Sequence, residues 1–75
     1  MARRLCDEVY DVLMQKIAAG EYSVGARLPS ELNLAKAAGV SRPVVRRALA
    51  RLRDGGLIRS RQGAGNFVVR HEARG

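Results

Sequence analysis

Arginine is the most frequent residue type in this sequence that can bind a partner through charge. Seven arginines fall between residues 42 and 61, where the only acidic residue is Asp54. Arginine forms planar, two-pronged hydrogen bonds with phosphates and guanine edges, which lysine cannot form. Because clustered like charges repel one another unless a partner neutralises them, this stretch indicates a surface that binds a polyanion.

The sequence carries no pattern of catalytic or metal-ligating residues. The one cysteine, Cys6, and the one histidine, His71, cannot together build a metal site, and Cys6 cannot form an internal disulfide. Cys6 is therefore expected to be a small, buried or half-buried apolar side chain. There is no Ser-His-Asp arrangement and no glycine-rich phosphate loop after a strand. We expect a protein that is not an enzyme and needs no cofactor or metal.

Length and composition define the class of protein. The chain has 75 residues, of which 47% are hydrophobic and 28% charged, and its net charge is +7. This composition is typical of one small globular domain. No apolar run is long enough to cross a membrane and the N-terminus has no signal-peptide core, so we expect a cytoplasmic protein with no membrane partner.

Apolar periodicity predicts a first helix from about residue 5 to residue 19. Leu5, Val9, Leu13 and Ile17 recur every four positions, which places them on one face of a helix. Gly20 then provides a C-terminal stop. The connector that follows contains Arg27 and Leu28, which can form a very short strand.

Two further helices are predicted around a short turn. Ser30 can cap a helix from Glu31 to about Ala38, which packs through Leu32 or Leu34 and Ala35. Residues 39–41 form the turn, and Ser41 can cap a helix over residues 42–54. This spacing is typical of a helix-turn-helix.

The third predicted helix has an apolar face and an arginine-rich face. Arg42 and Arg46 lie one turn apart near its start, and Pro43 and Arg47 also point away from the core. Small residues between them suit entry into a groove about 12 Å wide. We expect Arg51 and Arg53 to be solvated and not to bind DNA. The apolar face consists of Val45, Ala48, Leu49 and Leu52.

A β-hairpin is predicted after the third helix. Two short apolar runs, residues 57–58 and 67–69, flank a glycine-containing turn at residues 61–66. Helix, helix-turn-helix and hairpin in this order make a winged helix, a mainly α fold with a small β wing. The wing tip, Gln62-Gly63-Ala64-Gly65, has little side-chain bulk, which suits a minor groove about 6 Å wide. Within it, Gln62 and Gly63 are the candidate DNA contacts.

Five short motifs stand out between about Val9 and Val69. They are Ile17 with Gly20 and Gly25; Leu28-Pro29-Ser30-Glu31 with Leu34-Ala35; Gly39-Val40-Ser41-Arg42 with Val45-Arg46 and Ala48-Leu49; Gly56-Leu57-Ile58; and Gly63-Ala64-Gly65-Asn66-Phe67-Val68. In these motifs the chain resembles the N-terminal DNA-binding domain of the GntR family of bacterial transcription regulators.

The resemblance implies sequence-specific binding of double-stranded DNA. It implies that Arg42 and Arg46 read bases and hold phosphate, that Ser30 and Ser41 lie near the DNA backbone, and that Gly63 lies in the minor groove. The full set of DNA-binding residues expected from the sequence is Ser30, Glu31, Ser41, Arg42, Pro43, Val44, Arg46, Arg47, Gln62 and Gly63.

Three positions depart from the family pattern. Leu32 stands where the family often has arginine, Val44 where threonine is common, and Arg47 where glutamate is common. These departures bear on which base sequence is preferred and leave the expectation of DNA binding unchanged.

Such regulators carry a larger C-terminal domain that binds a small metabolite and usually dimerises the protein. By resemblance, we expect residues 1–70 to be the DNA-binding domain and residues 71–75 to be a tail or the start of a linker to such a domain, which this chain lacks. The isolated domain is expected to be monomeric or weakly dimeric. The full-length protein is expected to be a homodimer on a two-fold operator, associated with the bacterial nucleoid.

Other interpretations of a basic winged helix remain open. One is binding of RNA, or of nucleic acid by shape alone, although RNA readers stack bases on exposed aromatic residues and none lies in residues 42–61. Another is a protein-interaction domain, or the regulator half of a fused pyridoxal-phosphate-type protein, since that class shares the same N-terminal domain.

Overall fold

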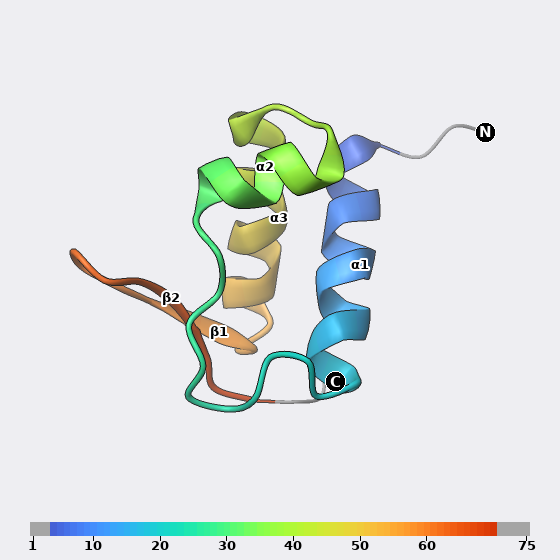
Figure 1. Cartoon of the computed structure of the whole chain (residues 1–75). Coiled ribbons are helices and arrows are strands. Elements are labelled where there is room, and N and C mark those ends of the chain that lie inside the picture. The colour runs from blue at the N-terminus through green and yellow to red at the C-terminus, as the bar shows by residue number, and fades with distance from the viewer. Residues whose placement is uncertain (1–3, 71–75) are drawn as a thin grey trace.

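The computed structural model describes residues 4–70 as three helices followed by a β-hairpin (Figure 1). The helices are α1 (Leu5–Ala18), α2 (Glu31–Ala38) and α3 (Arg42–Asp54), and the strands are β1 (Ile58–Arg61) and β2 (Gly65–Val68). This order confirms the predicted winged helix. The turn of the hairpin is shorter than the predicted range 61–66, because residue 61 pairs with residue 65 and residue 60 with residue 66, and backbone pairing does not require apolar side chains. The predicted tail at residues 71–75 lies outside the described residues. Within residues 4–70, no helix is long and apolar enough to cross a membrane.

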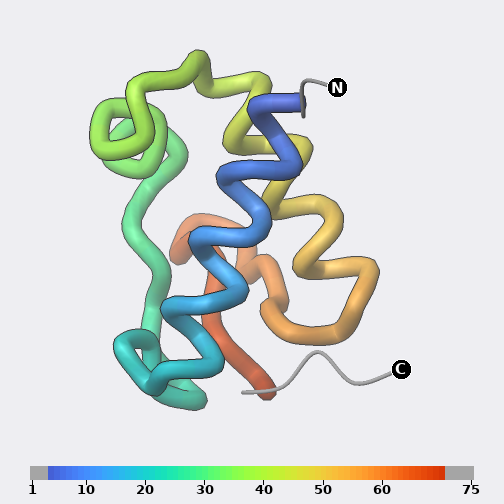
Figure 2. The backbone as a smooth tube through the Cα atoms, turned by 90° about the vertical axis from the view of Figure 1, so that its right-hand side faces the viewer, coloured from blue at the N-terminus to red at the C-terminus, as the bar shows by residue number. Residues whose placement is uncertain are grey.

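The core lies where α1 packs against α3 and where α2 and the hairpin close its two ends (Figures 1 and 2). Figure 2 shows α1 in front of α3, with the connector from α1 to α2 running along one side. The buried residues are all aliphatic: Val9, Leu13, Ile17, Leu28, Leu34, Ala35, Val45, Ala48, Leu49, Leu52, Leu57, Ile58 and Val68.

Most of the predicted apolar faces are buried as expected, with one exception. All four predicted residues of α3 are buried, and α2 packs through Leu34 and Ala35 while Leu32 is 46% exposed. In α1, Leu5 was expected on the buried stripe but is 52% exposed. Leu5 is the first residue of the helix and borders the open groove between α1 and α2, so the core does not reach it.

The two predicted serine caps differ in their hydrogen bonds. The Oγ of Ser30 accepts a hydrogen bond from the backbone N–H of Asn33 at 3.1 Å, as an N-cap does. Ser41 occupies the N-cap position of α3 with an extended backbone, but its side chain makes no capping hydrogen bond. Pro43 stands at one of the two positions whose N–H an N-cap accepts, and proline has no N–H to donate.

The wing is tied to the helical body through the connector before α2. β1 and β2 pair antiparallel, with Ile58 opposite Val68 and Arg61 opposite Gly65. On the other edge of β2, Leu28 donates its N–H to the carbonyl of Asn66 at 2.8 Å. The short strand predicted at residues 27–28 is present as a single bridge between residue 27 and residue 67. The hairpin therefore has a fixed position relative to α2 and α3.

Replacement of Leu52 tests the core. Leu52 is fully buried in α3, so Leu52→Ala should lower the free energy of unfolding by about 2–5 kcal/mol, because it removes buried methyl groups and leaves a cavity. Urea denaturation followed by circular dichroism measures the change. Leu32→Ala is the matched control, since the same truncation at a 46% exposed position of α2 should cost much less. Equal losses in the two variants would contradict this account of the core.

Candidate nucleic-acid interface

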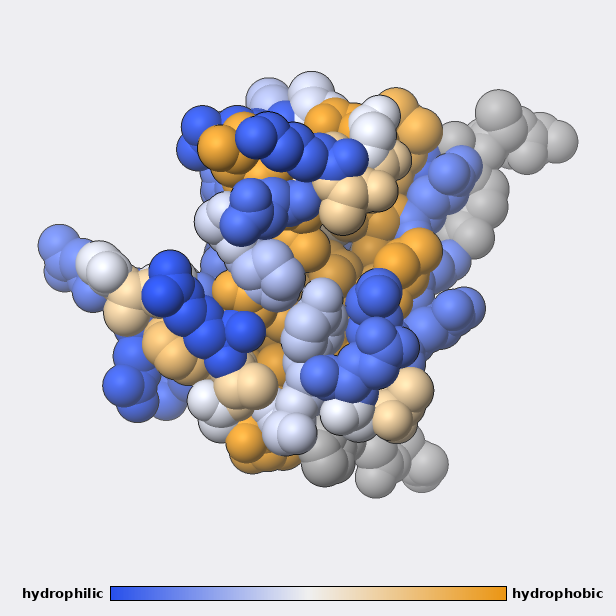
Figure 3. Space-filling view, viewed as in Figure 1, coloured by the Kyte–Doolittle hydropathy of each residue, from blue (hydrophilic) through white to orange (hydrophobic). Residues whose placement is uncertain are grey.

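The candidate DNA-binding residues come from three elements: the start of α2, the start of α3 and the wing tip. Figure 1 shows the hairpin projecting from the helical body on the side where α2 begins. On the face shown in Figure 3, hydrophilic residues (blue) gather along this wing and around α2, and hydrophobic residues (orange) show mainly between the helices. A cleft joins the three elements and is lined by residues that include Ser30, Arg42 and Gly65.

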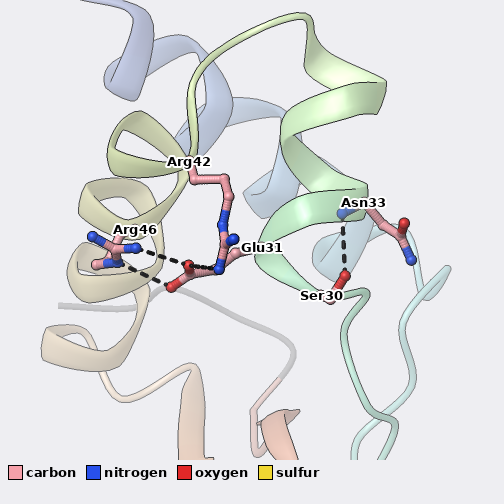
Figure 4. Close-up of polar contacts among 5 residues, drawn as sticks. All are labelled: Ser30, Glu31, Asn33, Arg42 and Arg46. Atoms are coloured by element: carbon pink, nitrogen blue, oxygen red, sulfur yellow. Dashed lines mark hydrogen bonds and ion pairs between the residues drawn. The ribbon is translucent and has the colours of Figure 1, made fainter.

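Glu31 connects α2 to α3 by holding two arginines. Its carboxylate accepts two hydrogen bonds from Arg46, from Nε to Oε2 at 3.2 Å and from Nη2 to Oε1 at 3.1 Å. Arg42 donates to the same Oε1 at 3.4 Å. Figure 4 shows both arginine side chains pointing from α3 toward Glu31. One carboxylate thus brings two guanidinium groups together.

The arrangement keeps Glu31 ionised. Hydrogen bonds and the positive charge of Arg46, with a further contribution from Arg42, lower the pKa of Glu31 below its ordinary value, although partial burial opposes the shift. The hydrogen bonds to Glu31 raise the pKa of Arg46 in turn. The two arginine side chains remain 56% exposed, whereas Glu31 is 27% exposed. The carboxylate is therefore the more enclosed partner, and the arginines keep surface for another ligand.

The other predicted residues of α3 are exposed to different degrees. Pro43 and Arg47 are exposed, and in the described part of the chain no hydrogen bond or ion pair engages the Arg47 side chain. Val44 is half-buried and packs against the core, so only part of its surface faces a partner. Ser41 is exposed, with its hydroxyl free of a capping contact.

The wing tip has the open geometry that its glycines suggested. Gln62 and Gly63 are both exposed, and Gly63 has a φ of +76°, which glycine adopts at little cost. A Cβ at Gly63 would meet no atom within 4 Å, so nothing in the described structure covers the tip. Lower on the wing, the guanidinium of Arg61 lies over the ring of Phe67, 5.3 Å from its centre.

The expectation that Arg51 and Arg53 are solvated is wrong, because both side chains connect elements of the fold. Arg51 pairs with Asp7 and lies over the ring of Tyr10 at 3.9 Å, which links α3 to α1. Arg53 is partly buried and donates to the side-chain oxygen of Asn66 at 3.2 Å, which links α3 to the wing. The partners come from distant parts of the sequence, so helix periodicity alone could not identify them. Both arginines are therefore engaged within the fold, and the partner of Arg53, Asn66, also lines the cleft.

Sequence reasoning missed one cation at this surface, Arg27. It was read only as part of a short strand, yet it lines the same cleft as Arg42. Its distance from the basic stretch of residues 42–61 hid the connection, which depends on the bridge between residue 27 and the wing. Cys6 is half-buried as expected. Among residues 4–70, no three His, Cys, Asp or Glu side chains gather as a metal site.

The pKa of Glu31 is a direct test of this geometry. We expect it to lie below the ordinary pKa of a glutamate in the folded domain, because of the hydrogen bonds and charge of Arg46, as measured by NMR titration of the side-chain carboxyl carbon. Because the folded-state pKa is lowered, Glu31 contributes stability above its unfolded-state pKa, and this contribution is lost as the pH falls through the folded-state pKa.

Arg46→Ala should raise the pKa of Glu31 back toward its ordinary value, because it removes the largest stabilising contact. Arg47→Ala is the matched control, since this neighbouring arginine makes no contact with Glu31. A titration midpoint that does not move in Arg46→Ala would show that the ion pair does not form in solution.

Comparison with known proteins places the chain in a family. The model of the family described as bacterial regulatory proteins, gntR family, matches residues 5–68. HTH-type transcriptional regulator Mce2R of Mycobacterium tuberculosis is 46% identical over 61 residues, which cover 81% of this chain and 25% of the relative. The putative L-lactate dehydrogenase operon regulatory protein of Escherichia coli is 43% identical over 68 residues, which cover 91% of this chain and 26% of that relative. This chain spans about a quarter of the length of these relatives.

A solved structure has the same fold. AraR(DBD) in complex with operator ORR3 superposes with a TM-score of 0.88 at 30% identity, covering 92% of this chain and 83% of that chain. The relatives are named as regulators, in agreement with the expectation that the chain is not an enzyme. Since the family model covers most of the chain and the fold agrees, the chain belongs to the gntR family of bacterial regulatory proteins, with the winged helix-turn-helix of their DNA-binding domains.

Proposed function

We propose that this domain binds double-stranded DNA in a sequence-specific manner as part of a bacterial transcription regulator. The start of α3 enters the major groove, and the wing tip lies near the minor groove. The observation that carries the proposal is the exposed pair of Arg42 and Arg46, which Glu31 holds side by side at the start of α3. The likeness to AraR(DBD), whose structure contains operator DNA, supports it.

Arg46 is suited to read a base because Glu31 orients it without using all of its donors. The carboxylate takes Nε–H and one Nη2–H, which leaves the remaining N–H groups of the guanidinium for a ligand. Two such donors match the O6 and N7 acceptors of guanine in the major groove. A side chain already held in place loses less conformational freedom on binding, so the ion pair favours recognition.

The helix starts supply contacts to the DNA backbone. Ser41 has an exposed hydroxyl with no capping contact, and it stands at the N-terminus of α3, where unpaired N–H groups favour anions. Ser30 stands at the same position of α2, but its Oγ already accepts from Asn33, so its hydroxyl hydrogen is the part left to donate. We assign both serines to phosphate contacts, which position the helix and carry no base preference.

The wing tip is assigned to the minor groove. Gly63 has open space on the side where a Cβ would stand, so the backbone can approach the floor of a groove about 6 Å wide. Gln62 precedes Gly63, and its side-chain amide can accept and donate hydrogen bonds in the minor groove.

For the full-length protein we propose a C-terminal domain that dimerises and binds a small metabolite. The relatives are about four times as long as the matched region, which leaves room for such a domain. Two copies of this domain would then meet a two-fold operator on DNA of the nucleoid, in the cytoplasm. The metabolite would change affinity by changing the spacing of the two copies.

Selection of random duplexes on the domain, tethered as a dimer, tests the function. We expect a two-fold motif with a guanine in each half-site. Arg46→Ala should weaken binding to that motif by about 1–3 kcal/mol and relax the base preference at one position of each half-site, because it removes a two-pronged contact. Fluorescence anisotropy with duplexes varied at each position measures both effects.

Lys36→Ala is the control for loss of one positive charge, since Lys36 is exposed in the last turn of α2. It should leave the base preference unchanged. If Arg46→Ala weakens binding to all duplexes equally, Arg46 contacts phosphate only. If no motif is enriched at any salt concentration, the proposal of sequence-specific binding is wrong.

A further inference from the structure

Arg27 is an exposed cation held at the base of the wing. Its backbone pairs with that of Phe67 across the edge of β2. Its side chain lies against Gly65, so that a Cβ atom on residue 65 would stand only 3.2 Å from the Nε of Arg27. In residues 4–70, no hydrogen bond or ion pair engages the guanidinium. The fold thus places a positive charge beside β2 and gives it no acceptor there.

The cleft next to Arg27 is suited to an anion. It has a volume of about 460 Å³ and is lined by Arg27, Arg42, Ser30 and Asn66 among others. Glu31 is the only acidic residue of its lining, and Arg42 and Arg46 already engage that carboxylate. The net charge of the lining is therefore positive, and an anion there would lie near two arginines, Arg27 and Arg42.

The position of the cleft indicates which anion would enter it. A single sugar-phosphate strand separates each major groove of DNA from the adjacent minor groove. If α3 lies in one groove and the wing tip in the next, that strand must cross the molecule between them. The cleft lies there, because Arg42 at the start of α3 forms one wall and Gly65 of β2 forms the other.

We propose that Arg27 binds a phosphate of the DNA strand that passes between α3 and the wing. This inference rests on the proposed function and adds a contact outside the helix-turn-helix and the wing tip. Gly65 is part of the device, because a side chain at that position would displace the guanidinium of Arg27. The contact is electrostatic, so it strengthens binding to every sequence and sets the register of the wing on the backbone.

The salt dependence of DNA binding tests the proposal. Each phosphate that a cation neutralises adds about 0.9 to the slope of log affinity against log salt concentration. Arg27→Gln keeps a long polar side chain against Gly65 but removes the charge, so it should lower this slope by about 0.9. It should weaken binding to the selected motif and to a scrambled duplex by the same factor. Arg27→Lys keeps the charge and should keep the slope.

Lys36→Ala is again the matched control and should change the slope much less than Arg27→Gln. Circular dichroism of each variant shows whether it is folded. The proposal is overturned if Arg27→Gln leaves the slope unchanged, or if its effect is confined to the selected motif, which would indicate a base contact. If a motif is enriched but Arg27→Gln leaves the salt-dependence slope unchanged, only this inference is refuted. If no motif is enriched, the proposed function is refuted.

A second source of phosphate is distinguished by NMR of the Arg27 Nε–H group. Duplex DNA should shift this resonance at stoichiometric concentration, and millimolar inorganic phosphate should shift it little. A strong shift with inorganic phosphate, combined with an unchanged slope in Arg27→Gln, would assign the cleft to a free anion and overturn the DNA contact.

Discussion

Burial of one face of α3 is the constraint on which the rest of the interface depends. Val45, Ala48 and Leu52 are completely inaccessible to solvent, and Leu49 nearly so. A fully buried aliphatic side chain of the size of valine or leucine contributes about 1.5–3 kcal/mol, so rotation of α3 about its axis would expose several such contributions at once. The opposite face must therefore point outward. Hydrophobic packing, and not attraction to DNA, holds Arg42 and Arg46 at the surface.

The arginines of α3 repel one another, and the fold divides them between two kinds of partner. Those in the second half of the helix, Arg51 and Arg53, contact α1 and the wing. In the first half, Arg42 and Arg46 share Glu31, and Arg47 has no such contact within the described residues. Exposed ion pairs add little to stability, since solvent screens them and the side chains lose freedom. The effect of Glu31 is therefore mainly orientation, and the outer sides of the same guanidinium groups remain exposed.

The wing derives its position from a segment that is distant in sequence. Asn66 accepts a hydrogen bond from the N–H of Leu28 through its backbone oxygen and one from Arg53 through its side chain. One residue of β2 thus connects the wing both to the connector before α2 and to α3. Attachment at these points holds the wing, while the exposed tip is closed by one backbone hydrogen bond, from the N–H of Ala64 to the carbonyl of Arg61 at 3.1 Å. The same attachment brings Arg27 to the cleft between wing and helices.

The sequence by itself determined the elements and the outward face of α3. Amphipathic periodicity, Ser30, Gly39 and the glycine turn are local signals, and they were enough to predict the order and type of the elements and the bounds of the helices to within about one residue. They did not predict the ends of the strands, because backbone pairing continues past the apolar runs into the glycine-containing segment. Leu5 was placed wrongly because periodicity cannot tell where a core ends.

Only the tertiary structure decided which arginines of α3 contact other elements of the fold, and that Arg27, from outside the basic stretch, lines the cleft beside Arg42. The contacts of Arg51 with Asp7 and Tyr10, of Arg53 with Asn66, and of Arg27 with Gly65 all join residues far apart along the chain. Charge and spacing describe one segment at a time. The position of one segment against another depends on packing and on backbone hydrogen bonds between them, which the linear pattern does not contain.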